Sequence, residues 1–275
     1  MTNDLPAVAI LGAGSMGGAI LSGILRSGAA VERDVRVTNR SATKAAGLRQ
    51  EGVVSLALES DETANLAAVE GARIVILGVK PAMVEPLLRE IAPALEDDAI
   101  VVSIAAGVTT EALESIVPGA VMRAMPNTPV AVGRGVTSLA AGTRATEADV
   151  ALVRRLFSAV GAVVEMPEHM VDAALAIAAS GPAYVYYFTE QLAAAATGFG
   201  FDERQASALA IGTVIGAGAL LDGGEPPAEL RRAVTSPNGT TERAIAELER
   251  GRLGQLVARA ATAARDRARE LAAGG

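Results

Sequence analysis

A glycine-rich segment near the beginning of the chain has the spacing of a dinucleotide-binding loop. Residues 7–11 form an apolar, strand-like run, and a GxGxxG pattern then leads into an apolar helical pattern. In such loops the first glycine permits a tight turn, the second lets the backbone approach a pyrophosphate, and the third lets the helix pack closely on the strand. The helix start offers free N–H groups and the positive end of its dipole to phosphates. The residues expected to contact the cofactor here are Gly12, Gly14, Ser15, Met16 and Gly17.

The residues after the second predicted strand favour a ribose 2′-phosphate over a free 2′-hydroxyl. Residues 34–38 alternate as a strand does, and Asn39, Arg40 and Ser41 follow, with Lys44 nearby. A site that prefers NAD usually carries Asp or Glu here, whereas a guanidinium pairs well with a phosphate. The alternative is a solvated turn before a helix that Ser41 caps. We therefore expect NADP(H) to be preferred over NAD(H).

Three further loops follow predicted strands and are expected to face the cofactor at the carboxyl edge of a sheet. Ligands of open α/β folds bind at that edge. Each loop taken alone could be an ordinary strand-to-helix turn, but three in succession favour a binding role. One of them contains Lys80, which with Lys44 makes up all the lysines of the chain. The residues expected to contact the cofactor are Val79, Lys80, Pro81, Ala105, Ala106, Gly107 and Asn127.

The scarcity of acid catalysts bears on the group that is reduced. Reduction of a carbonyl needs a positioned acid, usually His, Lys or Tyr. The one histidine, His169, lies in what looks like a helix start, and no lysine follows residue 80. Tyr184, Tyr186 and Tyr187 remain as acids or as packing residues of an apolar helix. A C=N group is basic enough to arrive protonated, so the missing acid favours an imine substrate.

The order of apolar runs predicts how these loops are positioned. Strand-like runs over residues 73–78, 99–104, 120–125, 136–140 and 161–164 alternate with helical patterns, as in a doubly wound parallel sheet. After Pro167 the chain contains long Ala-rich helical stretches and no convincing strand. We predict an α/β fold, with a Rossmann-like dinucleotide-binding domain over residues 1–165 and an all-helical domain over residues 166–275.

Composition excludes several classes of partner and site. The 275-residue chain has a formal charge of −7 and no basic cluster, which argues against a nucleic-acid partner. It has no cysteine, so disulfides, thiolate catalysis and cysteine metal sites are excluded, and no metal site is expected. Residues 1–6 carry an acid and no base, unlike a secretory signal. These features predict a cytoplasmic protein.

Residues 206–221 form an uncharged stretch that needs separate interpretation. The stretch is short for a bilayer span and consists largely of Ala and Gly. A helix that is apolar on all sides is normally surrounded by protein. We expect a buried helix here and no membrane partner. So much small apolar surface also favours cover by the same region of a second chain.

Two segments of the helical half are similar to the signatures of a known family. They are Ser180-Gly181-Pro182-Ala183-Tyr184 and residues 229–241, with the sequence ELRRAVTSPNGTT. Together with the glycine loop and the three later loops, in order and spacing, they resemble pyrroline-5-carboxylate reductases over essentially the whole chain. The resemblance implies reduction of L-1-pyrroline-5-carboxylate to L-proline, the last step of proline biosynthesis, usually with NADPH. It also implies dimers formed by the helical domains, frequently assembled into a decamer of five dimers.

Residues 235–241 have the features of a turn that opens a helix. Free N–H groups and hydroxyls gather there, and such helix starts bind carboxylates. The alternative is that Thr240 or Thr241 only caps the helix. The resemblance implies that this loop holds the carboxylate of the cyclic imino acid and that Thr241 hydrogen-bonds the ring nitrogen. It implies substrate contacts from Ser236, Gly239, Thr240 and Thr241, with Ser236 and Thr241 as the catalytic residues.

The chain departs from the family pattern at three places. Ala178-Ala179-Ser180 stands where the family has Ser-Gly-Ser, Asn238 stands where it has Gly, and Pro226 replaces a usual His. Asn tolerates a left-handed backbone well, so Asn238 is expected to keep the loop. The alternatives are a reductase of a six-membered cyclic imine, a deazaflavin-dependent NADP reductase, and an NADP(H)-binding protein without activity. The last is disfavoured by intact Ser236 and Thr241, and the deazaflavin enzyme would not require either signature.

Overall fold

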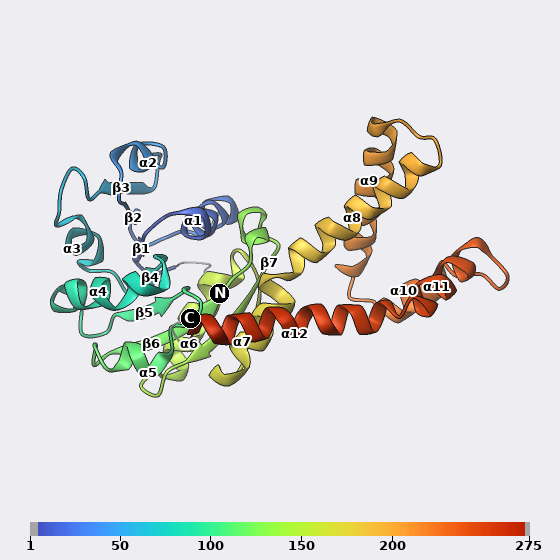
Figure 1. The fold of residues 1–275 in the computed structure, drawn as a ribbon. Coiled ribbons are helices and arrows are strands. Elements are labelled where there is room, and N and C mark those ends of the chain that lie inside the picture. Colours follow the sequence, from blue (N-terminus) through green and yellow to red (C-terminus); the bar gives the residue numbers. More distant parts are fainter. Residues whose placement is uncertain (1–4, 273–275) are drawn as a thin grey trace. The chain divides into compact units, whose positions relative to one another are not determined.

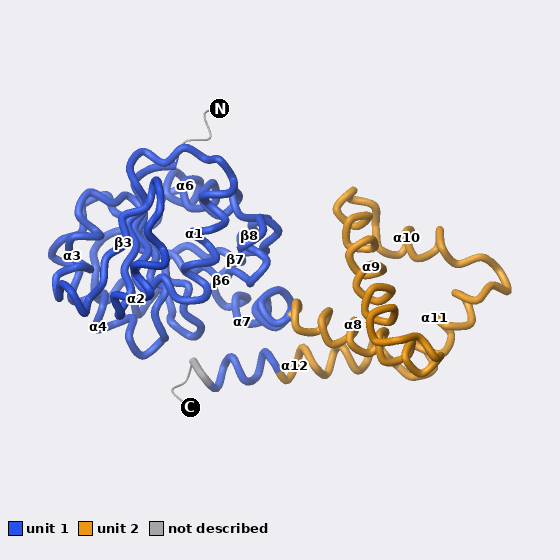
Figure 2. Tube along the Cα trace, turned by 90° about the horizontal axis from the view of Figure 1, so that it is seen from above, with its two compact units in different colours: residues 1–180, 264–275 blue, residues 181–263 orange. Residues whose placement is uncertain are grey.

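The computed structural model describes residues 5–272, which divide into two compact units (Figure 2). The described part of unit 1 is residues 5–180 and 264–272, and unit 2 is residues 181–263. The last strand ends at Glu165, so strands give way to helices at the predicted residue. The helical segments that follow directly, up to Ser180, still belong to unit 1.

Unit 1 contains an eight-stranded sheet in the order β3-β2-β1-β4-β5-β6-β7-β8 (Figure 1). This order contains the 3-2-1-4-5-6 arrangement of dinucleotide-binding sheets, as the strand pattern predicts. The strands are β1 (Val8–Leu11), β2 (Val35–Asn39), β3 (Val53–Ala57), β4 (Ile74–Leu77), β5 (Ile100–Ser103), β6 (Ala120–Met125), β7 (Gly135–Ala141) and β8 (Gly161–Glu165).

One pair of strands departs from the predicted parallel sheet. β7 runs antiparallel to β6, with Met125 opposite Ser138, whereas the other neighbouring pairs are parallel. The connection between the two strands contains only the 3₁₀ turn η2 (Thr128–Val132). A parallel return needs a crossover of a dozen or more residues, so this short connection forces the antiparallel direction.

Helices cover both faces of the sheet because successive side chains of a strand point to opposite faces. Ile10 and Ile76 pack in one core with Phe157 of α6, and Leu11 and Leu77 pack in the other, which α3, α4 and α5 complete. The helices are α1 (Ser15–Ser27), α2 (Ala42–Ala46), α3 (Ala64–Val69), α4 (Pro81–Ile91), α5 (Thr110–Glu114), α6 (Glu147–Ser158) and α7 (Val171–Ala174). Shorter turns are the 3₁₀ segments η1 (Ala92–Ala94) and η3 (Glu168–Met170) and the π-helical segment η4 (Leu175–Ala179).

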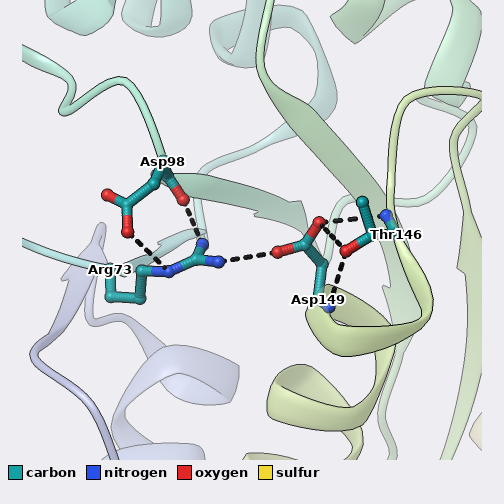
Figure 3. A network of polar contacts seen from close by, with 4 residues as sticks. All are labelled: Arg73, Asp98, Thr146 and Asp149. Carbon is teal, nitrogen blue, oxygen red and sulfur yellow. Dashed lines mark hydrogen bonds and ion pairs between the residues drawn. The ribbon is translucent and has the colours of Figure 1, made fainter.

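A polar network fixes the start of α6 (Figure 3). Nε of Arg73 lies 3.0 Å from the carboxylate of Asp98, and Nη2 lies 2.7 Å from Oδ1 of Asp149. The other carboxylate oxygen of Asp149 accepts bonds from the backbone N–H and hydroxyl of Thr146, whose hydroxyl accepts from the Asp149 N–H. Asp149 of this capping box thus links the start of α6 to Arg73, the residue before β4.

Unit 2 consists of helices. They are α8 (Gly181–Gly198), α9 (Glu203–Leu221), α10 (Pro227–Ala233), α11 (Thr240–Arg250) and most of α12 (Leu253–Ala272), whose last residues belong to unit 1. Asp202 and Gln205 form a capping box at the start of α9. The expected long uncharged helix is therefore present as part of α9.

The burial expected for that helix is not provided by a single chain. Within α9 only Ala206 and Ala210 are buried, whereas Ile215 and Leu220 are 67% and 61% exposed. Within the described residues nothing covers these apolar side chains of α9. The prediction of a buried helix is therefore wrong for a single chain. Among the described residues α9 is long and apolar enough to span a membrane, but this is weak evidence because helices of soluble proteins pass the same test.

Candidate active site

The glycine loop between β1 and α1 has the geometry that a dinucleotide requires. Gly12 has a φ of +82°, and a Cβ there would lie 2.7 Å from Cγ1 of Val79. A Cβ on Gly17 would lie 3.0 Å from the carbonyl oxygen of Gly12 and 3.1 Å from Ile10, so only glycine permits this close approach of helix to strand. A Cβ on Gly14 would approach nothing nearer than 4.0 Å. The backbone at Gly14 is thus open to a ligand.

Two residues that the sequence analysis missed hold this loop. The carbonyl oxygen of Thr38 accepts bonds from the N–H groups of Gly12 (3.1 Å) and Ala13 (2.9 Å). A Cβ on Gly78 would lie 2.8 Å from the carbonyl oxygen of Gly12, so the ends of β1 and β4 meet with almost no space between them. Gly78 directly precedes the loop that contains Lys80, which is predicted to face the cofactor. Thr38 gives no local signal, because its partner Gly12 lies 26 residues away along the chain.

Free donors at this edge of the sheet fit a dinucleotide cofactor. The N-cap of α1 is Gly14, which provides no side-chain cap, so Ser15, Met16 and Gly17 begin the helix with N–H groups that have no intrahelical partner. Asn39, at the end of β2, is 5% exposed, and its Nδ2 has no hydrogen-bond partner. A buried amide without a partner is costly unless a ligand satisfies it. The residues present therefore fit a pyrophosphate and an adjacent ribose.

The turn after β2 contains the predicted phosphate contacts. The side chain of Arg40 is exposed, and within residues 5–272 no carboxylate forms an ion pair with it. Ser41 is the N-cap of α2, and its hydroxyl accepts a bond from the N–H of Lys44 at 3.3 Å. The capping function considered for Ser41 is therefore present, and Arg40 remains the free cation of this turn.

A carboxylate that was not anticipated from the sequence reaches the same turn. Oε2 of Glu59 accepts a hydrogen bond from the backbone N–H of Ala42 at 3.0 Å. Glu59 follows β3, the neighbour of β2, and its own N–H donates to the carbonyl oxygen of Arg40 at 3.0 Å. The strand end that bears Arg40 thus has an acid beside it, from a different strand.

The loops after β4 and β5 reach the same edge as the glycine loop. Lys80 occupies the N-cap position of α4 with an exposed side chain, and Pro81 is the first residue of that helix. Ala105 is buried, Ala106 is half-buried, and Gly107 has a φ of +79°. Parallel strands present their carboxyl ends together, so these loops and the glycine loop form one edge.

The side chain of Asn127 is used within unit 1. Its Nδ2 donates to the carbonyl oxygen of Ala178 at 2.9 Å, and its Oδ1 accepts from the N–H of Val136 at 2.8 Å. Ala178 lies in η4, where the Ser180 N–H donates to the carbonyl oxygen of Leu175 at 3.0 Å in a π-helical turn. The side-chain amide of Asn127 therefore holds η4, the turn just before the Ser180–Tyr184 signature, in place. A contact of Asn127 with the cofactor stays a prediction.

A buried arginine fixes the same region from the sheet. Arg123 of β6 is 2% exposed, and its guanidinium lies 2.5 Å from the carboxylate of Asp172 in α7. Glu168 lies 3.9 Å from the guanidinium and accepts bonds from both the N–H and the hydroxyl of Thr110. These contacts tie α5, β6 and α7 together. The side chain of the neighbouring His169 is exposed.

The second candidate site lies in unit 2, where residues 235–241 turn into α11. Asn238 has a φ of +59°, the left-handed conformation expected for a residue that replaces glycine. Its N–H donates to the carboxylate of Glu242 at 2.7 Å, and the Gly239 N–H donates to the carbonyl oxygen of Ser236 at 3.0 Å. A Cβ on Gly239 would lie 2.9 Å from the backbone carbonyl oxygen of Ser236, so a larger residue would force the turn to shift.

The structure also shows whether Thr240 or Thr241 caps α11. The N-cap of α11 is Gly239, and no side chain caps this helix. Thr240 and Thr241 are its first two residues, so neither hydroxyl acts as the cap. The hydroxyl of Thr241, on a half-buried residue, is available for another partner. The helix start can accept an anionic group with its N–H groups while a hydroxyl is presented beside them.

Comparison with known families matches both parts of the chain. The family model described as pyrroline-5-carboxylate reductase dimerisation matches residues 168–271. A second model, described as coenzyme F420-dependent NADP oxidoreductase, matches residues 7–107. The first match contains both signatures of the helical half, and the second contains the glycine loop.

Individual relatives match nearly the whole chain. The pyrroline-5-carboxylate reductase of Mycobacterium tuberculosis is 39% identical, over 96% of this chain and 96% of the relative. Pyrroline-5-carboxylate reductase 3 of Danio rerio is 35% identical, over 98% of this chain and 94% of the relative.

Solved structures of such enzymes also superpose along the full length. The structure of a pyrroline-5-carboxylate reductase from Coxiella burnetii matches with a TM-score of 0.86 and 33% identity, covering 96% of this chain and 97% of that one. The Plasmodium falciparum pyrroline carboxylate reductase, crystallised with NADP bound, matches with a TM-score of 0.80 and 25% identity, covering 97% and 98%.

Proposed function

Because the chain belongs to the pyrroline-5-carboxylate reductase family, we propose that it reduces L-1-pyrroline-5-carboxylate to L-proline with NADPH as the preferred donor. The observation that carries this proposal is the loop before α11. It keeps its turn although Asn238 replaces a glycine, and it leaves the Thr241 hydroxyl out of helix capping. A chain that had lost this activity would have no need to keep both features.

The proposed chemistry needs little acid–base catalysis from the protein. The chemistry that bound NADPH would supply is a hydride for C5 of the protonated imine, with the C=N π electrons becoming the lone pair of the ring nitrogen. The N–H groups of Thr240 and Thr241, which follow the turn at Gly239, would hold the substrate carboxylate, with the Ser236 hydroxyl beside them. The Thr241 hydroxyl would accept a hydrogen bond from the ring N–H. Catalysis is then mostly positioning and charge complementarity.

The proposed coenzyme preference depends on the turn after β2. Arg40 presents an unpaired guanidinium there, with Lys44 on the following helix, and the amide of Asn39 lacks a partner. These groups suit a 2′-phosphate, which accepts charge-assisted hydrogen bonds. Ser15, Met16 and Gly17 would meet the pyrophosphate through their N–H groups.

We infer that the proposed enzyme is a cytoplasmic homodimer at least, with a decamer of five dimers as the larger assembly that the family resemblance implies. The dimerisation-family match over residues 168–271 and the exposed apolar side chains of α8 and α9 support the dimer. Residues 1–165 would bind the dinucleotide, and residues 166–275 would supply the substrate loop and the dimer contacts.

The decisive experiment is an assay of NADPH oxidation with two substrates, the five-membered pyrroline-5-carboxylate and a six-membered cyclic imino acid. We expect higher kcat/KM with the five-membered ring and with NADPH than with NADH. Higher kcat/KM with the six-membered ring would identify a related cyclic-imine reductase, in keeping with Ala178 in place of a polar serine. Absence of turnover with either ring would contradict the proposed reaction.

A further inference from the structure

Glu59 places a negative charge at the turn where the 2′-phosphate of NADPH is proposed to bind. The pairing of β2 with β3 extends past the strand ends, because the N–H of Leu58 donates to the carbonyl oxygen of Asn39 and that of Glu59 donates to Arg40, both at 3.0 Å. These two bonds put the backbone of Glu59 directly beside that of Arg40. Glu59 therefore occupies the end of the neighbouring strand at the same edge of the sheet.

The side chain of Glu59 is directed to the same turn. Its Oε2 accepts the bond from the Ala42 N–H at 3.0 Å, which holds the carboxylate two residues beyond Arg40. The second carboxylate oxygen makes no hydrogen bond within the described residues. At the end of β2, the Nδ2 of Asn39 is buried and has no partner within the described residues. A buried donor from the end of β2 and an exposed acid from the end of β3 thus both lie at this edge of the sheet.

An acid at this position favours the coenzyme without the 2′-phosphate. A carboxylate accepts a hydrogen bond from a ribose 2′-hydroxyl and repels a phosphate at the same carbon. We propose that Glu59 is a specificity-determining residue that reduces the preference for NADP(H) created by Arg40. The inference rests on the proposed function, because it requires the dinucleotide to bind at this edge of unit 1.

The test is calorimetric titration with adenosine 2′,5′-bisphosphate and with adenosine 5′-monophosphate, which differ only in the 2′-phosphate. Glu59→Gln keeps an acceptor for the Ala42 N–H and removes the charge. We expect this variant to bind the bisphosphate roughly three- to tenfold more tightly than the wild type at low salt, and to bind the monophosphate no more tightly. The gain should shrink at high salt.

Glu62→Gln is the matched control, because Glu62 is an exposed acid three positions along the chain with no hydrogen bond in the described structure. An unchanged ratio of the two affinities in Glu59→Gln, or an equal change in Glu62→Gln, would overturn the inference. A lower melting temperature without a change in the ratio would assign Glu59 to capping of α2 alone. A wild type that does not prefer the bisphosphate would instead contradict the proposed coenzyme preference. The two failures are therefore distinguishable.

Discussion

Asn238 and Thr241 show how single residues define the loop that we propose to bind the substrate. Asn238 adopts the left-handed backbone that a glycine would adopt freely, and the side chain of Glu242 holds its N–H. The loop can therefore differ from the family pattern and keep its shape. Thr241 stands at the second position of α11, where it is not needed as a cap. Its hydroxyl is thus free to serve the reaction.

Thr241→Ala is expected to lower kcat on the order of ten- to a hundredfold. A hydrogen bond to a charged partner contributes about 1.5 to 3 kcal/mol, and each 1.4 kcal/mol is a factor of about ten in rate. NADPH affinity should hardly change, because the proposed cofactor contacts lie in unit 1. Thr241→Ser keeps the hydroxyl and should retain much of the activity. Turnover, NADPH binding and melting temperature should be measured on both variants. An alanine variant that melts early yet turns over normally would refute the catalytic function.

Arg40→Asp is expected to weaken NADPH binding by roughly 1.5 to 3 kcal/mol, because it removes a charge-assisted contact and adds repulsion. NADH binding should change much less. Dissociation constants for both coenzymes, measured by fluorescence titration, check this prediction, with Arg26→Asp as a control at the end of α1. Equal losses for the two coenzymes, or none for NADPH, would show that Arg40 does not contact the 2′-phosphate.

At the scale of elements, polar side chains fix helix starts against the sheet. Asp149 both caps α6 and pairs with Arg73, as Figure 3 shows. Burial by itself raises the pKa of Asp149, but the hydrogen bonds from Thr146 and Arg73 outweigh it and hold the pKa below its ordinary value. A carboxyl whose pKa is lower in the folded state stabilises the fold above its unfolded pKa. That stabilisation is lost as the pH falls through the folded pKa.

We expect the free energy of unfolding to fall as the pH drops below about 4, the ordinary pKa of Asp, and Asp149→Asn to reduce this dependence. At pH 7 the variant should lose about 2 kcal/mol, because the amide has one acceptor oxygen and can keep either the bond from Arg73 or the bonds from Thr146, and what it keeps is no longer charge-assisted by the carboxylate. Urea unfolding at pH 7 and pH 3 measures both quantities. Asp97→Asn, at an exposed acid, is the control. An equal pH dependence in wild type and Asp149→Asn would exclude Asp149 as a source of acid sensitivity.

At the scale of the whole molecule, unit 2 exposes more apolar surface than a stable monomer would leave in water. Tyr187 of α8 and Ile215 of α9 are 64% and 67% exposed. Contiguous apolar surface on this scale marks an interface. The match to the dimerisation family suggests what covers this surface, namely a second copy of the chain. The proposed dimer would therefore account for the exposure of α9, because a second protomer would supply the layer that covers it.

Ile215→Glu is expected to weaken self-association at least tenfold, because it places a charge where the partner would bury an isoleucine. Sedimentation equilibrium at low micromolar concentration should show a dimer or larger assembly for the wild type and a dissociated fraction for the variant. Ala148→Glu, an apolar-to-acid change on the exposed face of α6 in unit 1, is the control. A wild-type monomer that is stable and active at that concentration would contradict the dimer.

Local patterns in the sequence determined the fold class, the glycine loop and the substrate turn. The strand run followed by Gly12, Gly14 and Gly17 is a local signature that can be recognised from neighbouring residues, and the same holds for the turn at Asn238. Composition likewise excluded cysteine chemistry without any structure.

Tertiary structure decided the features that depend on pairing between distant residues. Glu59 reaches the turn after β2 because β2 and β3 lie side by side. Its contact there, the N–H of Ala42, is 17 residues away along the chain. Asn127 donates a hydrogen bond to the carbonyl oxygen of Ala178, 51 residues further along the chain, and its strand-end position gave no indication of this bond. The antiparallel direction of β7 follows from the short connection after β6 and shows only once the two strands are seen to pair. The exposure of α9 depends on which residues pack against it, and sequence periodicity carries no information about partners far along the chain or in a second copy.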